Sequence, residues 1–222
     1  MLGVYVDSDV EVTPLTRIEG ALLVLPRAAL AMGVTALWLH GVQVGDPDPL
    51  RFVVPRPHQV RRPGMKVSRV QTLPPTRGRA VSPEHAFVTA ATELDLIDLV
   101  CAGDRLVRLR CCTLESLREY AESASALARR AASLVRERVD SLRETRLRLC
   151  LVLADIPEPQ CNIVIKMDGH PIGRVDLLLE EFRVIVEYDG DQHRTDKAQW
   201  SIDIYRGEEF GALGYRLSLI HI

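Results

Sequence analysis

The chain lacks any apolar run that approaches the roughly 18 to 20 residues of a membrane-spanning helix. Its start, "MLGVYVDSDVEV", also lacks the basic and then apolar order of a secretory signal peptide. These absences argue against a membrane partner and make the cytoplasm the expected location. With 222 residues, 47% of them hydrophobic and 26% charged, and a net charge of -2, the composition predicts a soluble globular protein of one large or two small domains.

Cysteine is sparse, and its spacing contains no C-x-x-C pair. Neighbouring cysteines rarely bridge each other, so reduced thiols are favoured over metal ligands or disulfides. Thiols of this kind are usually buried, and we expect most of these to lie in the core. The five residues are Cys101, Cys111, Cys112, Cys150 and Cys161.

Acidic residues are absent from residues 51 to 79, although eight basic residues lie in this stretch. Such a run neutralises phosphates and predicts DNA as the partner, bound in a salt-dependent and mostly sequence-independent way. The alternative is a solvated, proline-rich loop whose arginines partly pair with acids elsewhere. Few aromatic residues lie among the basic ones, so stacking on single-stranded bases is not indicated. The residues expected to bind DNA are Arg56, Arg61, Arg62 and Lys66.

Helical periodicity dominates residues 82 to 154. Ser82 and Pro83 fit an N-cap and a first helical residue, and Thr113 is placed as the cap of a later helix. Residues 25 to 44 mix helical spacing with glycines, which predicts two short helices. The alternating stretches "RFVVP" and "KVSRVQTL" predict two strands in a small β-hairpin, with the basic loop between them as a wing.

The period changes from helical to strand-like after the prolines at residues 157 and 159. The stretches "CNIVIKM", "RVDLLL" and "FRVIVEYD" predict three strands, which a helical stretch and a last strand, "YRLSLIHI", follow. The predicted fold class is therefore α/β (α+β). A mixed sheet flanked by helices is expected over residues 133–222, after a mainly helical, winged-helix-like DNA-binding region with a small β-hairpin over residues 1–132.

Two acids interrupt strands that are otherwise apolar. Asp176 lies within "GRVDLLL", and Glu187 lies within the next expected strand. A buried acid is costly unless something pairs with it, and adjacent carboxylates repel each other unless a cation lies between them. Mg²⁺ relieves such repulsion and needs only one or two protein carboxylates. The pair therefore predicts a metal site.

The stretch "VEYDGDQH" adds further candidates beside Glu187. Asp189 lies two residues beyond it, so strand alternation places both side chains on one face, where Asp189 is a third candidate ligand. His193 follows closely, and a histidine titrates near neutral pH and can exchange a proton with a metal-bound water. Asp191, next to Gly190, is best explained as a turn residue.

The motif "RVDLLLEEFRVIVEYDGDQHR", with "SLRETRLRL" before it and "QWSIDIYRGEEFGALGYRLSLI" after it, resembles the PD-(D/E)XK (restriction-endonuclease-like) superfamily. It looks most like the very-short-patch-repair-like (Vsr-like) domain of many bacterial proteins, over about residues 140–222. The resemblance implies a restriction-endonuclease-like fold and nuclease activity. It implies that Asp176 is the first motif acid and Glu187 the second.

Further residues follow from the resemblance. Asp189 stands where many members carry Lys, so His193, together with Gln192, is expected to take part of that role. The first helix of the superfamily commonly presents a Glu to the site, and Glu144 matches it; an ion pair with Arg148 at i+4 is the alternative. In the following helix, Arg206 matches a position from which it is expected to contact phosphate.

Residues 25 to 130 resemble, more loosely, the antitoxin-like region of type IV toxin-antitoxin AbiEi proteins. The phrases that carry this likeness are "VTALWLHGV" and "VSPEHAFVTAATELDLIDLVCAGDRLVR", and they imply a DNA-binding helix-turn-helix-like unit. The predicted function is a metal-dependent endonuclease that hydrolyses DNA phosphodiester bonds with Mg²⁺ or Mn²⁺. The alternative is a catalytically inactive DNA-binding transcriptional regulator or antitoxin of the AbiEi type.

Overall fold

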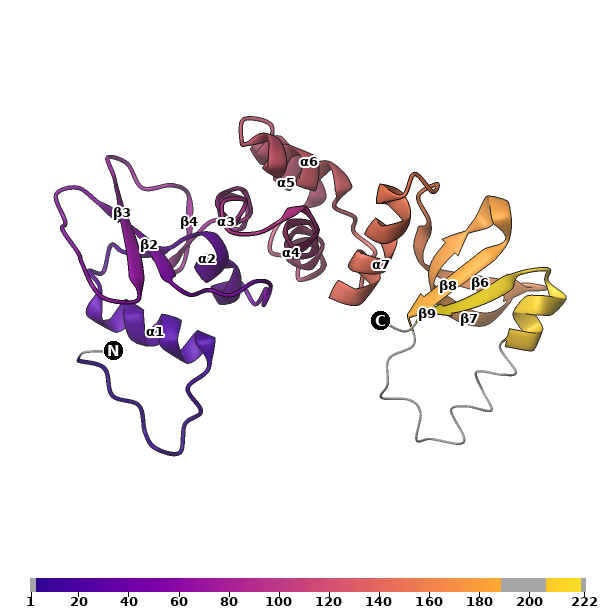
Figure 1. Ribbon diagram of the computed structural model, residues 1–222, viewed down its shortest axis with the longest axis horizontal. Coiled ribbons are helices and arrows are strands. Elements are labelled where there is room, and N and C mark those ends of the chain that lie inside the picture. The colour runs from indigo at the N-terminus through magenta and orange to yellow at the C-terminus, as the bar shows by residue number, and fades with distance from the viewer. Residues whose placement is uncertain (1–2, 189–206, 221–222) are drawn as a thin grey trace. The chain divides into compact units, whose positions relative to one another are not determined.

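The computed structural model describes residues 3–188 and 207–220 of the chain. The chain divides into two compact units, Met1–Glu137 and Arg138–Ile222, and each is described by itself (Figure 1). Both contain helices and a mixed β-sheet, so the predicted α+β class is confirmed. The division falls a few residues after the expected boundary at 132/133, which lies inside a helix that ends at Leu134.

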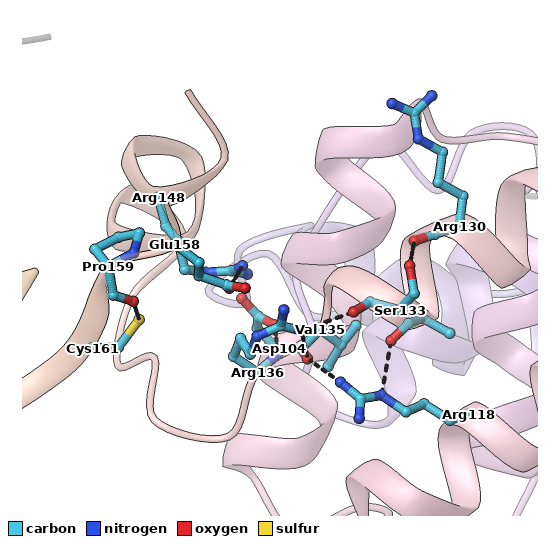
Figure 2. Close-up of polar contacts among 11 residues, drawn as sticks. Asp104, Arg118, Arg130, Ser133, Val135, Arg136, Arg148, Glu158, Pro159 and Cys161 are labelled. Carbon is cyan, nitrogen blue, oxygen red and sulfur yellow. Dashed lines mark hydrogen bonds and ion pairs between the residues drawn. The ribbon is translucent and has the colours of Figure 1, made fainter. Parts of the chain in front are cut away.

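The end of the first unit is fastened to its interior by polar contacts. Val135 is fully buried, and the guanidinium of Arg118 donates hydrogen bonds to the carbonyls of Ala132 and Val135 (Figure 2). The buried carboxylate of Asp104 accepts a hydrogen bond of 2.7 Å from the backbone N–H of Arg136. These contacts explain why the first unit extends beyond the expected boundary.

The first half of unit 1 is a small five-stranded sheet with two helices, and its strands have the order β3-β2-β1-β5-β4. The expected hairpin of the two longer strands is wrong, because β2 and β3 run parallel, with Leu50 opposite Met65 and Pro55 opposite Val70. The small antiparallel hairpin of this unit is formed by β4 and β5 instead. The elements are α1 Pro14–Val24, β1 Leu30–Ala31, α2 Gly33–Leu39, β2 Leu50–Pro55, β3 Met65–Val70, β4 Thr76–Arg77 and β5 Ala80–Val81.

The connection over residues 56–64 makes the parallel pairing possible. An extended chain covers about 3.3 Å per residue, so this connection can return along the whole six-residue strand β2 before β3 begins. The backbone N–H of Leu50 donates to Gly64 O, and that of Arg56 donates to Val70 O, both at 3.0 Å. These two bonds close the pairing at both ends.

Residues 25–44 contain the helix α2 with the short strand β1 before it, so the prediction of two helices there is wrong. Gly33 begins α2 with φ +57°, and a side chain at this position would meet the carboxylate of Glu93. The other helix of this region, α1, begins earlier. Thr13 caps it by accepting the Thr16 N–H, and Pro14 is its first residue.

The second half of unit 1 is helical, as predicted. Ser82 caps α3 by accepting the His85 N–H, and Thr113 caps α5 by accepting the Ser116 N–H, which confirms both expected starts. No helix within the described residues is long and apolar enough to cross a membrane. The helices are α3 Pro83–Ala90, α4 Leu96–Arg108, α5 Leu114–Ala121 and α6 Ala126–Leu134.

Unit 2 begins with a helix and continues with a four-stranded sheet in the order β6-β7-β8-β9. The first three strands are antiparallel neighbours, and β9 lies parallel to β8, so the predicted mixed sheet is confirmed. Residues 207–212 are helical. The elements are α7 Leu142–Leu153, β6 Gln160–Met167, β7 His170–Leu179, the 3-10 turn η1 Glu180–Phe182, β8 Val184–Tyr188 and β9 Arg216–Ile220.

Both faces of this sheet carry a small apolar core. The α7-side cluster joins α7 to β7 and β8 and consists of Leu147, Leu177 and Val186. The Phe210-side cluster joins the helical residues 207–212 to the other face and consists of Ile165, Val175, Leu178, Ile185 and Phe210. The expectation of a sheet flanked by helices is therefore met within unit 2 (Figure 1).

The five cysteines, all within the described ranges, carry thiols rather than disulfides. The expectation that most are buried holds only in part, because Cys101 is buried, Cys150 is exposed and the others are half-buried. Burial raises the pKa of the Cys112 thiol to about 12. A thiol with so high a pKa is hardly ionised at neutral pH and is a poor nucleophile or metal ligand.

Candidate functional site

Asp176 of β7 and Glu187 of β8 lie on adjacent antiparallel strands. The register pairs Leu177 with Val186, so these two acids occupy the next opposed positions. Both side chains are half-buried. The backbone N–H of Tyr188 donates a hydrogen bond of 3.0 Å to Asp176 Oδ2, which ties the first acid to the end of the second strand. The structure therefore brings together the two acids that the sequence singled out.

The strand β7 is irregular at Asp176. Val175 packs in the Phe210-side cluster and Leu177 in the α7-side cluster, although a regular strand places residues two apart on the same face. On β6, the position opposite Asp176 is Asn162, which has φ +52°. Local irregularities of this kind redirect side chains and recur next to active sites. The acid pair thus lies where the sheet changes the facing of its side chains.

Glu144 is buried at the start of α7, where it has a clear structural role. The N-cap residue Ser141 accepts the Glu144 N–H, and the Glu144 carboxylate accepts the backbone N–H of Asp140 at 3.0 Å. Its Oε2 also accepts a hydrogen bond of 2.7 Å from Asn162 Nδ2. Since Asn162 lies opposite Asp176 in the register of β6 and β7, this bond places Glu144 next to the strand neighbour of Asp176.

Arginines of α7 contribute positive charge to unit 2. Arg148, the alternative partner expected for Glu144, is completely buried and places Nη1 3.1 Å from Glu158 Oε1 (Figure 2). The guanidinium carbon of Arg143 lies 4.9 Å from the centre of the Tyr188 ring. Because Tyr188 follows Glu187 directly, Arg143 is a cation close to the end of β8.

Two residues near the acid pair were not expected from the sequence. Asn162 interrupts the apolar strand β6 in the same way as Asp176 interrupts β7. A polar residue inside an apolar strand is therefore the sequence signal that points to Asn162. Arg143 belongs to an arginine-rich helix, and nothing in the sequence distinguishes it from its neighbours. The "S-x-x-E" spacing of Ser141 and Glu144 is typical of a helix start and explains the position of Glu144 without a metal.

The other expected site residues lie outside the described residues; they are Asp189, Gln192, His193 and Arg206. Among residues 3–188 and 207–220, no group of three or more His, Cys, Asp or Glu side chains is arranged to hold a metal ion. Within the described residues, the oxygen ligands for an ion at this position are the carboxylates of Asp176 and Glu187. Two carboxylates fit Mg²⁺, which keeps several of its waters when it binds to proteins.

The expected DNA-binding residues lie in unit 1, on the loop 56–64 and on β3, which is an edge strand. Arg56, Arg61 and Lys66 are exposed, and Arg62 is half-buried. Arg69, on the same strand as Lys66, is exposed as well. We refer to these five residues together as the basic surface of unit 1.

Three other basic residues of the same stretch serve the fold. Arg51 pairs with Glu93 at 2.7 Å, and Arg77 donates to the carbonyl of Cys111. The guanidinium of Arg79 donates to the carbonyls of Leu22, Pro26 and Ala29. The alternative expectation, that some of these arginines pair with acids elsewhere, is therefore met by Arg51.

Unit 1 also contains two histidines with perturbed titration. A groove of about 650 Å³ between α3 and α5 is lined in part by His85, whose Nδ1 lies 2.8 Å from the Tyr120 hydroxyl. The His40 ring donates from Nε2 to the carbonyl of Val81 at 2.8 Å. Burial lowers the pKa of both histidines, so both are neutral at pH 7. They act as uncharged hydrogen-bonding groups in the folded unit.

Comparisons with protein-family models, with curated proteins and with solved structures found no match to the chain. The likeness of residues 140–222 to the PD-(D/E)XK nucleases, and that of residues 25–130 to AbiEi proteins, therefore stay predictions from the motifs themselves. The acid pair and the basic surface are the features of the chain that bear on its function.

Proposed function

We propose that the chain is a metal-dependent endonuclease that hydrolyses phosphodiester bonds of DNA with Mg²⁺ or Mn²⁺. The observation that carries this proposal is the opposed position of Asp176 and Glu187 on β7 and β8. Two half-buried acids at opposed positions repel each other, and a divalent cation between them relieves that repulsion.

Asp176 and Glu187 are the residues proposed to hold the ion. A divalent ion bound there would stabilise negative charge on the phosphate and lower the pKa of a bound water. The Tyr188 N–H fixes the orientation of Asp176, so this carboxylate does not depend on the ion for its position. Asp189 as a further ligand, and His193 with Gln192 in proton transfer, complete the proposal from the sequence.

The basic surface supports DNA as the substrate class. Arg56, Arg61 and Lys66 are exposed and close in sequence, and Arg62 lies between them. Phosphate contacts by such residues position a duplex without reading its sequence. Arg206, from the sequence, is proposed as a phosphate contact in unit 2.

The second candidate is a DNA-binding regulator of the antitoxin type without catalysis. It is favoured by the location of the basic surface in unit 1, which contains neither Asp176 nor Glu187. It is also favoured by Glu144, whose burial is explained by its contacts at the start of α7. DNA binding by unit 1 needs no metal, so the two candidates differ in the role of the acid pair.

Nicking of supercoiled plasmid in Mg²⁺ or Mn²⁺ tests the proposal. We expect cleavage by the wild-type chain and its loss in Asp176→Ala and Glu187→Ala. Glu181→Ala is the matched control, because Glu181 is an exposed acid of the same unit outside the site. Cleavage that is equal in all four proteins would contradict the metal site, and DNA binding without cleavage by any of them would support the regulator.

A further inference from the structure

Asn162 has two features that cost stability. Its φ of +52° lies in the left-handed region, which asparagine enters more easily than most residues but which a strand normally avoids. Its Oδ1 is buried and accepts no hydrogen bond within the described part of the chain. Costly local features that persist at one residue point to a constraint other than folding.

The amide nitrogen of Asn162 shows what that constraint is. Nδ2 donates to Glu144 Oε2 at 2.7 Å and to the carbonyl of Arg138 at 2.9 Å. The residue thus connects β6 to the start of α7 and to the segment before it. On β6 it lies between the pairs Cys161↔Leu177 and Ile163↔Val175, which places it opposite Asp176.

We propose that Asn162 is a positioning residue of the metal site, which holds the Glu144 carboxylate beside the strand that carries Asp176. The capping of α7 does not need Asn162, because Ser141 and the Asp140 N–H already satisfy it. The hydrogen bond from Asn162 Nδ2 fixes the position of the Glu144 carboxylate next to β6. Glu144 then adds negative potential to the acid pair and strengthens cation binding. This inference rests on the proposed function.

The test is Mn²⁺ binding to the full-length, metal-free chain without DNA, measured by isothermal titration calorimetry. Asn162→Gly removes the side-chain amide, and glycine tolerates the positive φ. We expect about tenfold weaker Mn²⁺ binding, which is typical when a residue that hydrogen-bonds the groups around a metal ion is lost. Tyr215→Phe is the control, because it removes one hydrogen bond, to Glu180, from the same unit, and it should leave Mn²⁺ affinity unchanged.

A double-mutant cycle separates positioning from structural support. If Asn162 acts through Glu144, Glu144→Gln weakens Mn²⁺ binding as well, and adding Asn162→Gly to it has no further effect. Independent effects of the two substitutions would overturn the inference, as would an unchanged affinity of Asn162→Gly.

Further outcomes are also decisive. If Asn162→Gly does not fold, Glu144→Gln carries the test, because it keeps an oxygen that accepts the Asp140 N–H; its unchanged affinity would overturn the inference. A wild-type chain that binds no Mn²⁺ would overturn the metal site itself. Wild-type binding that both single variants leave unchanged would overturn only the positioning role and leave the proposed function standing.

Discussion

Replacing Glu187 by Gln is expected to stabilise the sheet of unit 2 in the absence of divalent ions. Glu187 and Asp176 lie opposite each other, and cross-strand neighbours have Cβ atoms about 5 Å apart. At this separation two unit charges repel by about 0.8 kcal/mol at the dielectric constant of water and by about 3 kcal/mol at an effective value of 20. Both side chains are half-buried, and solvent screening favours the lower part of this range, about 1 kcal/mol.

Glu187→Gln is the chosen change, because it keeps the size and shape of the side chain and leaves the bond from the Tyr188 N–H to Asp176 in place. The assay is urea unfolding monitored by hydrogen exchange of the backbone amides of β7 and β8. This readout reports unit 2 alone, which matters because the two units can unfold separately. With a slope of about 2 kcal/mol per molar urea, the midpoint should rise by about 0.5 M in EDTA. Mg²⁺ should stabilise the wild-type chain and have little effect on the variant.

The control for this experiment is Glu181→Gln, which neutralises an exposed acid of the same unit. We expect its midpoint to match the wild-type value in EDTA and its response to Mg²⁺ to remain. An unchanged or lower midpoint for Glu187→Gln in EDTA would refute the argument from repulsion. Equal stabilisation of the wild-type chain and Glu187→Gln by Mg²⁺ would refute the argument for the cation.

Two further predictions concern unit 1. Burial lowers the folded-state pKa of His40 and His85 below the usual value of about 6.5, so the unfolded chain binds more protons as the pH falls through that value. Stability of unit 1 should therefore fall below about pH 6.5, and thermal unfolding of the His40→Gln/His85→Gln variant should show a shallower fall; equal pH profiles would contradict this cause. For the basic surface, Arg61→Ala and Lys66→Ala should each weaken duplex binding and reduce the slope of log affinity against log salt by about 0.9. Arg77→Ala is the matched control from the same stretch, because Arg77 donates to the carbonyl of Cys111. Fluorescence anisotropy at several salt concentrations measures duplex binding by the three variants and the wild-type chain. Salt slopes that are identical in all four proteins would show that the basic surface does not contact phosphates.

The strands of unit 2 could be predicted from the sequence because each has a strong local pattern. The sequences of β6, β7, β8 and β9 are apolar and are bounded by turn residues. These strands are short, so few alternative pairing registers are available to them. Asp176 and Glu187 were identifiable because charge is rare in such strands. Their opposition across β7 and β8 followed from the short connection over η1.

The pairing of β2 with β3 could not be predicted from local pattern. The connection over residues 56–64 is shorter than the dozen or more residues that usually join parallel strands, so the local pattern favours an antiparallel hairpin. The chain instead returns along β2 and pairs in parallel. The helix α1 is a different case, because Thr13 and Pro14 form the same start signal as Ser82 and Pro83. That signal was present in the sequence, and the weak periodicity after it concealed the helix.

The contacts of Glu144 and Asn162 depend on tertiary structure. The "S-x-x-E" spacing predicts that Glu144 belongs to a helix start, but its bond to Asn162 joins α7 to β6 across a loop. The left-handed conformation of Asn162 has no marker in the residues around it. Long-range contacts of this kind follow from how the helix packs on the sheet, which a single sequence does not specify.

The central claim is that Asp176 and Glu187 bind one divalent ion together. The most direct test is a crystal structure of the full-length chain with Mn²⁺, in which anomalous scattering locates the metal. The account predicts one peak between the two carboxylates, with oxygen distances of about 2.1 Å to each. Crystals that hold Mn²⁺ only at other residues, or a peak that contacts neither acid, would contradict it.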